Sequence, residues 1–183
     1  MRNKRKTKSM QKTMAKKDAK EEVAVVDRND RLIGKADRES VIRNRKYFRA
    51  VRIFIKNKSG EFTLLKRTES KIVFPGCWEL GAGGAVKPGE TYLAAAKREI
   101  KEELGITDPN LKLIRKVRIE IPEENLFVKV YSLTYDGKYK LQKSEVTDFM
   151  TLPREKIAGF GRKNKIHYPT FNYFAKFSKE RLL

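Results

Sequence analysis

The feature that most constrains the fold is one predicted helix. It carries a stripe of apolar residues, which can pack in a hydrophobic core, and a cluster of acids beside that stripe. Apolar periodicity predicts a helix from Glu90 to Leu104, which Gly105 ends as the C′ residue. The apolar stripe of this helix consists of Leu93, Ala96, Ile100 and Leu104. Positions i, i+3 and i+4 beside the stripe place three carboxylates within an arc of roughly 100°. The three acids are Glu99, Glu102 and Glu103. The helix therefore offers one face to a core and an adjacent face to a ligand.

A divalent cation would explain the acidic cluster. Like charges at i and i+4 destabilise a helix by about 0.2–0.5 kcal/mol, so helix formation alone does not favour three neighbouring glutamates. Mg²⁺, or Mn²⁺, is held by such carboxylates together with substrate phosphate oxygens. Glu90 and Arg98 are spaced to pair about two turns apart. Four glycines in the preceding loop let the backbone approach a ligand closely, and these are Gly81, Gly83, Gly84 and Gly89.

The charge of the chain indicates anionic partners. The 183 residues carry a formal charge of +20, of which the first twenty carry +8, from nine Lys or Arg against one Asp. Residues 1–20 are predicted to be a basic, disordered tail. An electrostatic arm for RNA, DNA or an acidic membrane surface is a sharper interpretation, and a targeting peptide a weaker one. The remainder is also basic and suits any polyanion, including a small diphosphate.

Cysteine content and hydropathy exclude several classes of protein. The single cysteine, Cys77, excludes an intramolecular disulfide framework, and no Cys/His cluster has zinc spacing. No apolar run approaches the roughly 20 residues that a membrane helix needs. These features favour a cytoplasmic protein.

The other segments predict more strands than helices. Strands are expected at 22–27, 31–35, 47–56, 61–67, 111–120, 126–134 and 146–152. Helices are expected at 38–44, capped by Asp37, from 153 onward, and over 170–183, with Phe171, Phe174 and Phe177 at helical spacing. Phe74–Trp78 resembles a loop, and the glycine-rich residues from Gly81 form the loop before the helix. This mixture predicts an α+β class, with helices packed on a mixed sheet.

The spacing of the loop and helix resembles a complete Nudix box. Its fixed positions are Gly84, Glu90, Arg98-Glu99-Ile100, Glu102-Glu103 and Gly105-Ile106. The likeness extends toward the branch nearest type I isopentenyl-diphosphate isomerases, through Val26-Asp27, Asp30, Ile33-Gly34, Arg38, Arg49-Ala50, Phe74-Pro75-Gly76, Trp78 and Gly83-Gly84. The resemblance implies a Nudix domain over residues 21–183, an α/β/α sandwich whose mixed sheet is packed between helices.

The resemblance also implies a chemistry, the Mg²⁺-dependent hydrolysis of a diphosphate linkage in a nucleoside diphosphate derivative or a related substrate. The implied metal ligands are the three glutamates of the helix, with the backbone carbonyl of Gly84 or its neighbour, whereas Glu90 and Arg98 are structural. The general base is Glu103 or a carboxylate outside the box. The outside candidates are Glu145, which we prefer, and Glu123, Glu124 and Asp148.

Further expectations concern the residues that bind phosphate and the alternative functions of the protein. Arg67 and Lys71 lie near the loop and could contact phosphate, and His167 is expected to make a local hydrogen bond. An isomerase is disfavoured, because the isomerase Cys and His positions read Gly83, Ala85 and Phe48 here. An RNA-associated protein with this fold, either a binding module or an RNA-end hydrolase, stays open, as do a homodimer and the substrate itself.

Overall fold

The sheet is organised around one long strand, β3 (Tyr47–Lys56). In the computed structural model, which describes residues 20–183, β3 pairs along its whole length in parallel with β8 (Asn125–Thr134). It also pairs antiparallel with the short β6 (Ala82–Ala85). The remaining strands on this side are β1 (Glu22–Val26), β2 (Leu32–Asp37) and β7 (Lys112–Glu120).

A second group of strands departs from β3 at a hairpin. β4 (Phe62–Arg67) pairs with β3 only through Lys56 and Phe62. It then pairs antiparallel with β5 (Trp78–Leu80) and β9 (Val146–Leu152). Because β3 and β4 share no further ladder, the two groups of strands separate beyond the hairpin.

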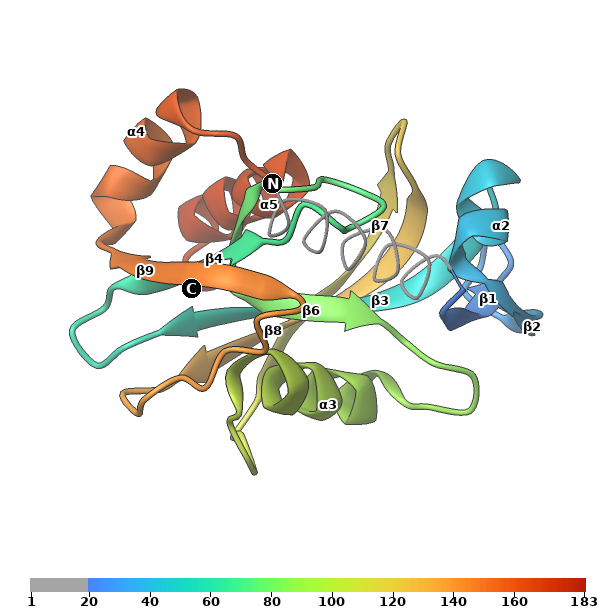
Figure 1. Cartoon of the computed structure of the whole chain (residues 1–183), viewed down its shortest axis with the longest axis horizontal. Helices are drawn as coiled ribbons and strands as arrows, with labels where there is room; N and C mark the ends of the chain where they lie inside the picture. The colour runs from blue at the N-terminus through green and yellow to red at the C-terminus, as the bar shows by residue number, and fades with distance from the viewer. Residues whose placement is uncertain (1–19) are drawn as a thin grey trace, which may run out of the picture.

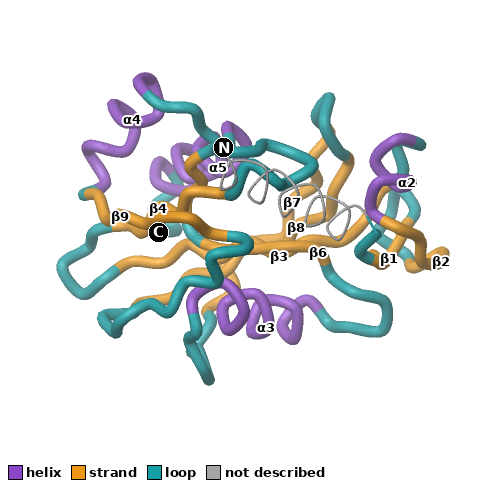
Figure 2. Tube along the Cα trace, viewed as in Figure 1, coloured by secondary structure: helices purple, strands orange, loops and turns teal. Residues whose placement is uncertain are grey.

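Helices cover both faces of the sheet, as Figure 1 and Figure 2 show. α3 (Tyr92–Leu104) packs against β3 and β6 on one face, and α5 (Tyr168–Lys179) lies on the other. α4 (Arg154–Lys163) precedes α5, and the short α2 (Arg38–Arg43) follows β2. The predicted α/β/α sandwich is therefore confirmed.

The ends of α3 follow from local chemistry. The Thr91 side chain accepts from the Ala94 amide as N-cap, and Gly105 adopts the left-handed conformation, with φ of 71°, at the C-terminal end. The predicted start at Glu90 was therefore two residues early. Leu93 was wrongly placed in the apolar stripe, since it is 45% exposed. The first turn instead directs Tyr92 inward, where its hydroxyl donates to Asp30.

The glycine-rich segment predicted as a loop forms β6 and the turn before it. A Cβ on Gly81 would lie 1.8 Å from the Ile53 carbonyl oxygen, and one on Gly83 would lie 2.2 Å from that of Val51. Only glycine allows this close approach to β3, so residues of low β-propensity form a strand here.

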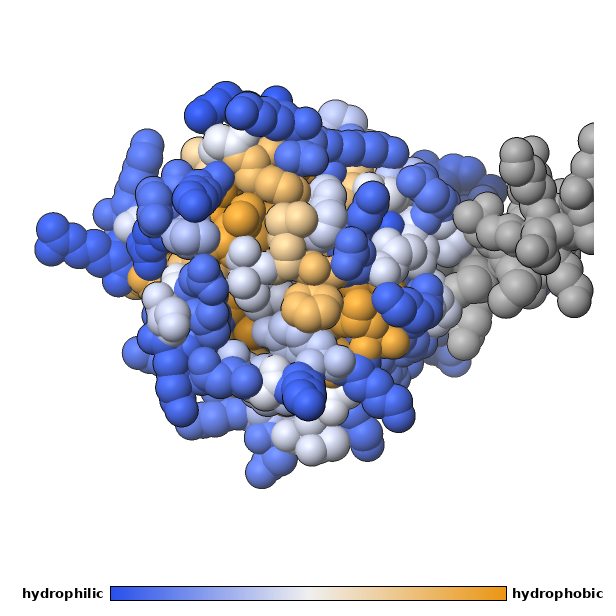
Figure 3. Space-filling view, turned by 60° about the vertical axis from the view of Figure 1, so that its left-hand side comes forward, coloured by the Kyte–Doolittle hydropathy of each residue, from blue (hydrophilic) through white to orange (hydrophobic). Residues whose placement is uncertain are grey.

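The surface adds two observations. Figure 3 shows hydrophilic side chains around an apolar area on one face of the molecule. Phe149 of β9 is 41% exposed and is among the large apolar side chains that stay accessible.

Within residues 20–183, no helix is both long and apolar enough to cross a membrane. The homodimer stays a prediction, and residues 1–19 of the predicted tail lie outside the described residues.

Candidate active site

Arg98 joins the loop to the helix face. Its Nε and one Nη donate to the two carboxylate oxygens of Glu90, at 2.9 and 3.0 Å, and that same Nη also donates to the Ala85 carbonyl. The other Nη donates to Glu99 at 2.6 Å and to Glu102 at 3.1 Å. The predicted pairing of Glu90 and Arg98 is therefore present. The same guanidinium also gathers two of the three helix glutamates.

Glu99 lies against the backbone of Gly84. A Cβ on Gly84 would meet the Glu99 carboxylate at 2.3–2.7 Å, so only glycine leaves room for that carboxylate. Glu99 is 5% exposed. Burial raises its pKa to about 7 despite the opposing charge of Arg98.

Glu102 and Glu103 differ in depth. Glu103 is 2% exposed and accepts from the Gly83 amide at 3.3 Å. Burial, followed by the charges of Glu79 and Glu99, raises the pKa of Glu103 well above its ordinary value. The Glu102 side chain is 44% exposed and stands at the mouth of the cavity described below.

Of the acids predicted outside the box, Glu145 interacts electrostatically with this cluster. Its charge is one of the causes that raise the pKa of both Glu99 and Glu103. It forms an ion pair with Lys71 at 3.0 Å. The other three acids have different settings: the side chain of Glu123 accepts from Tyr168, Glu124 pairs with Arg38, and Asp148 lies exposed on β9.

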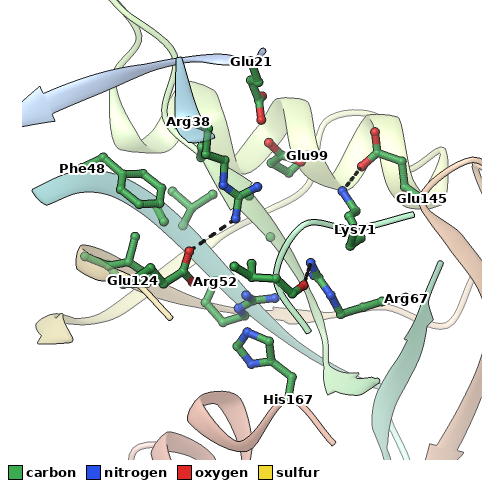
Figure 4. A pocket seen from close by; sticks show the side chains of 18 of the residues that line it. Glu21, Arg38, Phe48, Arg52, Arg67, Lys71, Glu99, Glu124, Glu145 and His167 are labelled. Carbon is green, nitrogen blue, oxygen red and sulfur yellow. Dashed lines mark hydrogen bonds and ion pairs between the residues drawn. The ribbon is translucent and has the colours of Figure 1, made fainter. Parts of the chain in front are cut away.

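Glu99, Glu102 and Glu145 border a cavity of about 820 Å³ (Figure 4). Glu21, Glu99 and Glu145 lie on one side of it in this view, and Arg52 and His167 on the other. The apolar walls between them come from β3, β7, β8 and α5. Their side chains include Phe48, Ile119, Leu126, Val128, Val130 and Pro169. The volume lies within the range typical of small-molecule sites.

Arg67 lines the cavity, but its guanidinium already has protein partners. One Nη donates to both carboxylate oxygens of Glu79, at 3.1 and 3.2 Å, and the remaining nitrogens donate to the carbonyls of Val73 and Phe74. Because these bonds engage all three guanidinium nitrogens, we do not keep Arg67 as a phosphate-binding candidate. Lys71, whose side chain also lines the cavity, remains a prediction.

Sequence reasoning missed a charged network beneath the cluster. Glu79 of β5 is 1% exposed and pairs with Arg67 and, at 2.6 Å, with Arg52 of β3. Burial alone would raise the pKa of Glu79, but the charges of the two arginines hold it at about 2. One signal was available: Arg52 alternates with Ala50 and Phe54, so it interrupts an otherwise apolar face of the strand.

The residues at the isomerase positions supply no side-chain ligands. Gly83 and Ala85 form part of β6, and Phe48 is 1% exposed on the cavity wall. His167 makes the predicted local hydrogen bond, since its Nδ1 accepts from the Thr170 amide at 3.4 Å. This arrangement favours hydrolase chemistry over isomerase chemistry.

The acids fit a divalent cation in donor type and in packing. Within residues 20–183, no three Asp, Glu, His or Cys side chains already converge on one point. Even so, the chain brings hard oxygen donors to one edge of the cavity, and glycine replaces any side chain that would fill the space beside Glu99. Carboxylates whose burial disfavours charge are stabilised when a cation neutralises them.

Comparison with known proteins decides the family. The Nudix domain family matches residues 46–174. The chain belongs to the Nudix hydrolases. A Nudix hydrolase of Pseudomonas aeruginosa, itself uncharacterized, is 37% identical over 126 residues, which cover 69% of this chain and 75% of the relative. Members of this family are enzymes that act on nucleoside diphosphate-linked compounds, a class of acid anhydrides.

Solved structures agree with this Nudix assignment. A protein of Deinococcus radiodurans, DR0079, matches with a TM-score of 0.69 at 25% identity, covering 80% of this chain and 92% of that one. The MutT protein of Methanosarcina mazei matches with a TM-score of 0.64 at 30% identity, covering 74% and 95%. The Nudix fold predicted from the box is therefore confirmed.

Proposed function

We propose that this Nudix protein is a Mg²⁺-dependent hydrolase that cleaves the diphosphate linkage of a small nucleoside diphosphate derivative or a related diphosphate. The observation that carries the proposal is the contact of the Glu99 carboxylate with Gly84, at the edge of a cavity large enough for an organic substrate. A bound Mg²⁺ would neutralise the diphosphate and acidify water. Mn²⁺ would serve the same donors.

Each residue of the cluster has a distinct role in this proposal. Glu99, Glu102 and Glu103 would hold the cation, together with the Gly84 carbonyl. Arg98 positions the first two carboxylates, and the Gly83 amide positions the third. Glu90, in the loop before the helix, accepts hydrogen bonds from Arg98 and so fixes the position of its guanidinium. Its role is therefore structural.

Glu145 is our choice for the general base. It lies close enough to Glu99 and Glu103 to affect their pKa values, and its pairing with Lys71 orients the carboxylate. Glu103 is the alternative base, and Glu102 is the most accessible acid of the helix. Lys71 would also attract the phosphate, because its ammonium lies at the cavity wall.

The cavity favours a small substrate over an RNA end. Its walls enclose an apolar interior with buried charges, whereas single-stranded RNA uses grooves with exposed aromatic platforms. Binding of RNA by residues 1–20 stays a separate prediction. It is tested by the salt dependence of RNA binding with and without those residues.

Substitution of the acids tests the proposal. Glu102→Gln and Glu103→Gln should each lower kcat by roughly 10²–10⁴-fold in a screen of nucleotide sugars, dinucleoside polyphosphates and isoprenoid diphosphates. Glu155→Gln, an exposed acid of α4, is the matched control and should retain wild-type turnover. EDTA should abolish phosphate release and Mg²⁺ should restore it. Turnover of either variant at the wild-type rate would refute the assigned roles.

A further inference from the structure

Arg52 presents unused hydrogen-bond donors to the cavity. One Nη donates to Glu79 at 2.6 Å, and the other Nη and the Nε make no hydrogen bond within residues 20–183. Neither nitrogen is sealed from solvent, and the side chain lines the cavity. Its exposed fraction is only 16%, so the open part of the guanidinium faces the interior.

His167 adds a second donor beside Arg52 (Figure 4). His167 is 5% exposed. Its ring packs against the ring of Phe74, with 4.3 Å between the two ring centroids. Burial, followed by the charge of Arg52, holds the pKa of His167 well below its usual value, so the ring is neutral. Because Nδ1 accepts from the Thr170 amide, the proton resides on Nε2. No residue of the described chain accepts from that Nε2, and His167 lines the cavity.

The charges at this end of the cavity do not balance. Arg52 and Arg67 contribute two positive charges and Glu79 contributes one negative charge, while His167 is neutral. Glu103 also interacts with Arg67 and Glu79, but its burial raises its pKa and favours the uncharged carboxyl. The neighbouring pair of Arg38 and Glu124 adds no net charge. An excess positive charge in a mostly apolar cavity attracts an anion more strongly than it would in water.

We propose that Arg52 and His167 form a subsite for an anionic group, a carboxylate or a phosphate, carried at the far end of the substrate's organic part. The apolar side chains that line the cavity, which include Phe48, Leu126 and Val128, would contact the organic part that joins the two anionic ends. The inference rests on the proposed function, because that function places the diphosphate at the glutamates. It narrows the substrate to a compact diphosphate with two anionic ends.

Three synthetic alkyl diphosphates of equal chain length provide the test. They end in a carboxylate, a phosphate or a methyl group, and kcat/KM is measured with Mg²⁺. For wild-type protein, kcat/KM should be higher for at least one anionic compound than for the methyl compound by about tenfold or more. Comparison of the two anionic compounds shows whether the subsite takes a carboxylate or a phosphate. Binding of the matching methylene-bisphosphonates, measured by calorimetry, should show the same order.

Arg52→Met should erase this preference. We expect kcat/KM for the preferred anionic compound to fall by about 10–100-fold through KM, and that for the methyl compound to change less than threefold. Arg52→Lys should retain part of the preference, and Arg43→Met, on the exposed side of α2, should retain all of it. The fold should survive in Arg52→Met, since Glu79 keeps Arg67 as its partner. His167→Gln, which keeps a donor, should retain most of the preference, and His167→Phe should lose part of it.

Three outcomes separate the possibilities. Equal hydrolysis and equal binding of all three compounds by wild-type protein would overturn the subsite. An equal loss for all three compounds in Arg52→Met would also overturn it, because Arg52 would then serve the diphosphate. Preferential binding of the anionic bisphosphonates without any hydrolysis would support the subsite and refute only the proposed hydrolysis.

Discussion

The two faces of β3 are built from alternate residues of one strand and yet differ in kind. Toward α3, Val51, Ile53 and Ile55 join a cluster of aliphatic and tyrosine side chains. Toward α5, the same strand presents Arg52 between Ala50 and Phe54, and this face is hollowed by the cavity. The α3 face is thus a solid core, whereas the α5 face combines apolar walls with buried charge.

This difference shows where the fold can carry chemistry. The solid face fixes α3 against the sheet through Ile100 and Leu104, both fully buried. Because the helix is fixed, its glutamates reach the rim of the hollow face from a rigid support. The cavity lies on the hollow face, where charged groups such as Glu79 are retained at some cost in stability.

Removal of the Glu79 charge should produce the largest loss of stability. Glu79→Gln leaves Arg52 and Arg67 buried without their shared counter-ion, and we expect the free energy of unfolding to fall by roughly 3–5 kcal/mol. Urea denaturation measures this loss, with the exposed Glu155→Gln as control. A loss below about 1 kcal/mol would show that solvent in the cavity already stabilises both arginines.

A matched pair of leucines compares the two faces directly. Leu104→Ala removes a fully buried side chain from the solid face and should cost about 3–5 kcal/mol. Leu126→Ala removes a cavity wall that is already incompletely packed, so it should cost about 1–2 kcal/mol less. The difference in the urea midpoints of the two variants is the measurement. Equal losses would mean that the α5 face is as tightly packed as the α3 face.

The local signals of the helix could be predicted from the sequence, but contacts across the sheet could not. The spacing of Glu90 and Arg98 predicted their pairing, because the long side chain of a helical arginine points back toward the N-terminus of its helix, where Glu90 precedes the first turn. β6 was missed because strand formation there depends on contact with β3, which compensates for glycine. Leu93 fitted the helical period, but the position of Tyr92 at the helix start decides which side is buried.

The ion pair of Arg52 and Glu79 could not be predicted from the sequence for a related reason. Arg52 and Glu79 are 27 residues apart, and neither belongs to a motif of fixed spacing. A single charge in a strand is normally assigned to the solvent face, so only the assembled sheet brings these two together. The same contact could not be foreseen for Arg67, whose guanidinium donates to Glu79.

The smallest expected effect is a loss of stability at acid pH that arises from His167 on the hollow face. The folded state holds the pKa of His167 well below 6.5, so below that pH the unfolded chain binds a proton that the fold excludes. This uptake lowers stability by up to about 1.4 kcal/mol per pH unit as the pH falls. Glu99 and Glu103, whose pKa values are raised, shift stability in the opposite direction, so only a difference between two proteins isolates His167.

His167→Gln supplies that difference. Glutamine does not titrate and can still accept from the Thr170 amide, so the variant should lose stability at pH 7.5 but regain it relative to wild type between pH 6.5 and 5. The free energy of unfolding from urea titrations at each pH, with EDTA present, measures the divergence. Leu104→Ala, which removes no titratable group, should instead run parallel to wild type. Parallel profiles for His167→Gln would mean that His167 is as easily protonated in the fold as in the unfolded chain. The cavity would then be wet enough to accept a charged imidazole, which would add its positive charge to that of the arginines at acid pH.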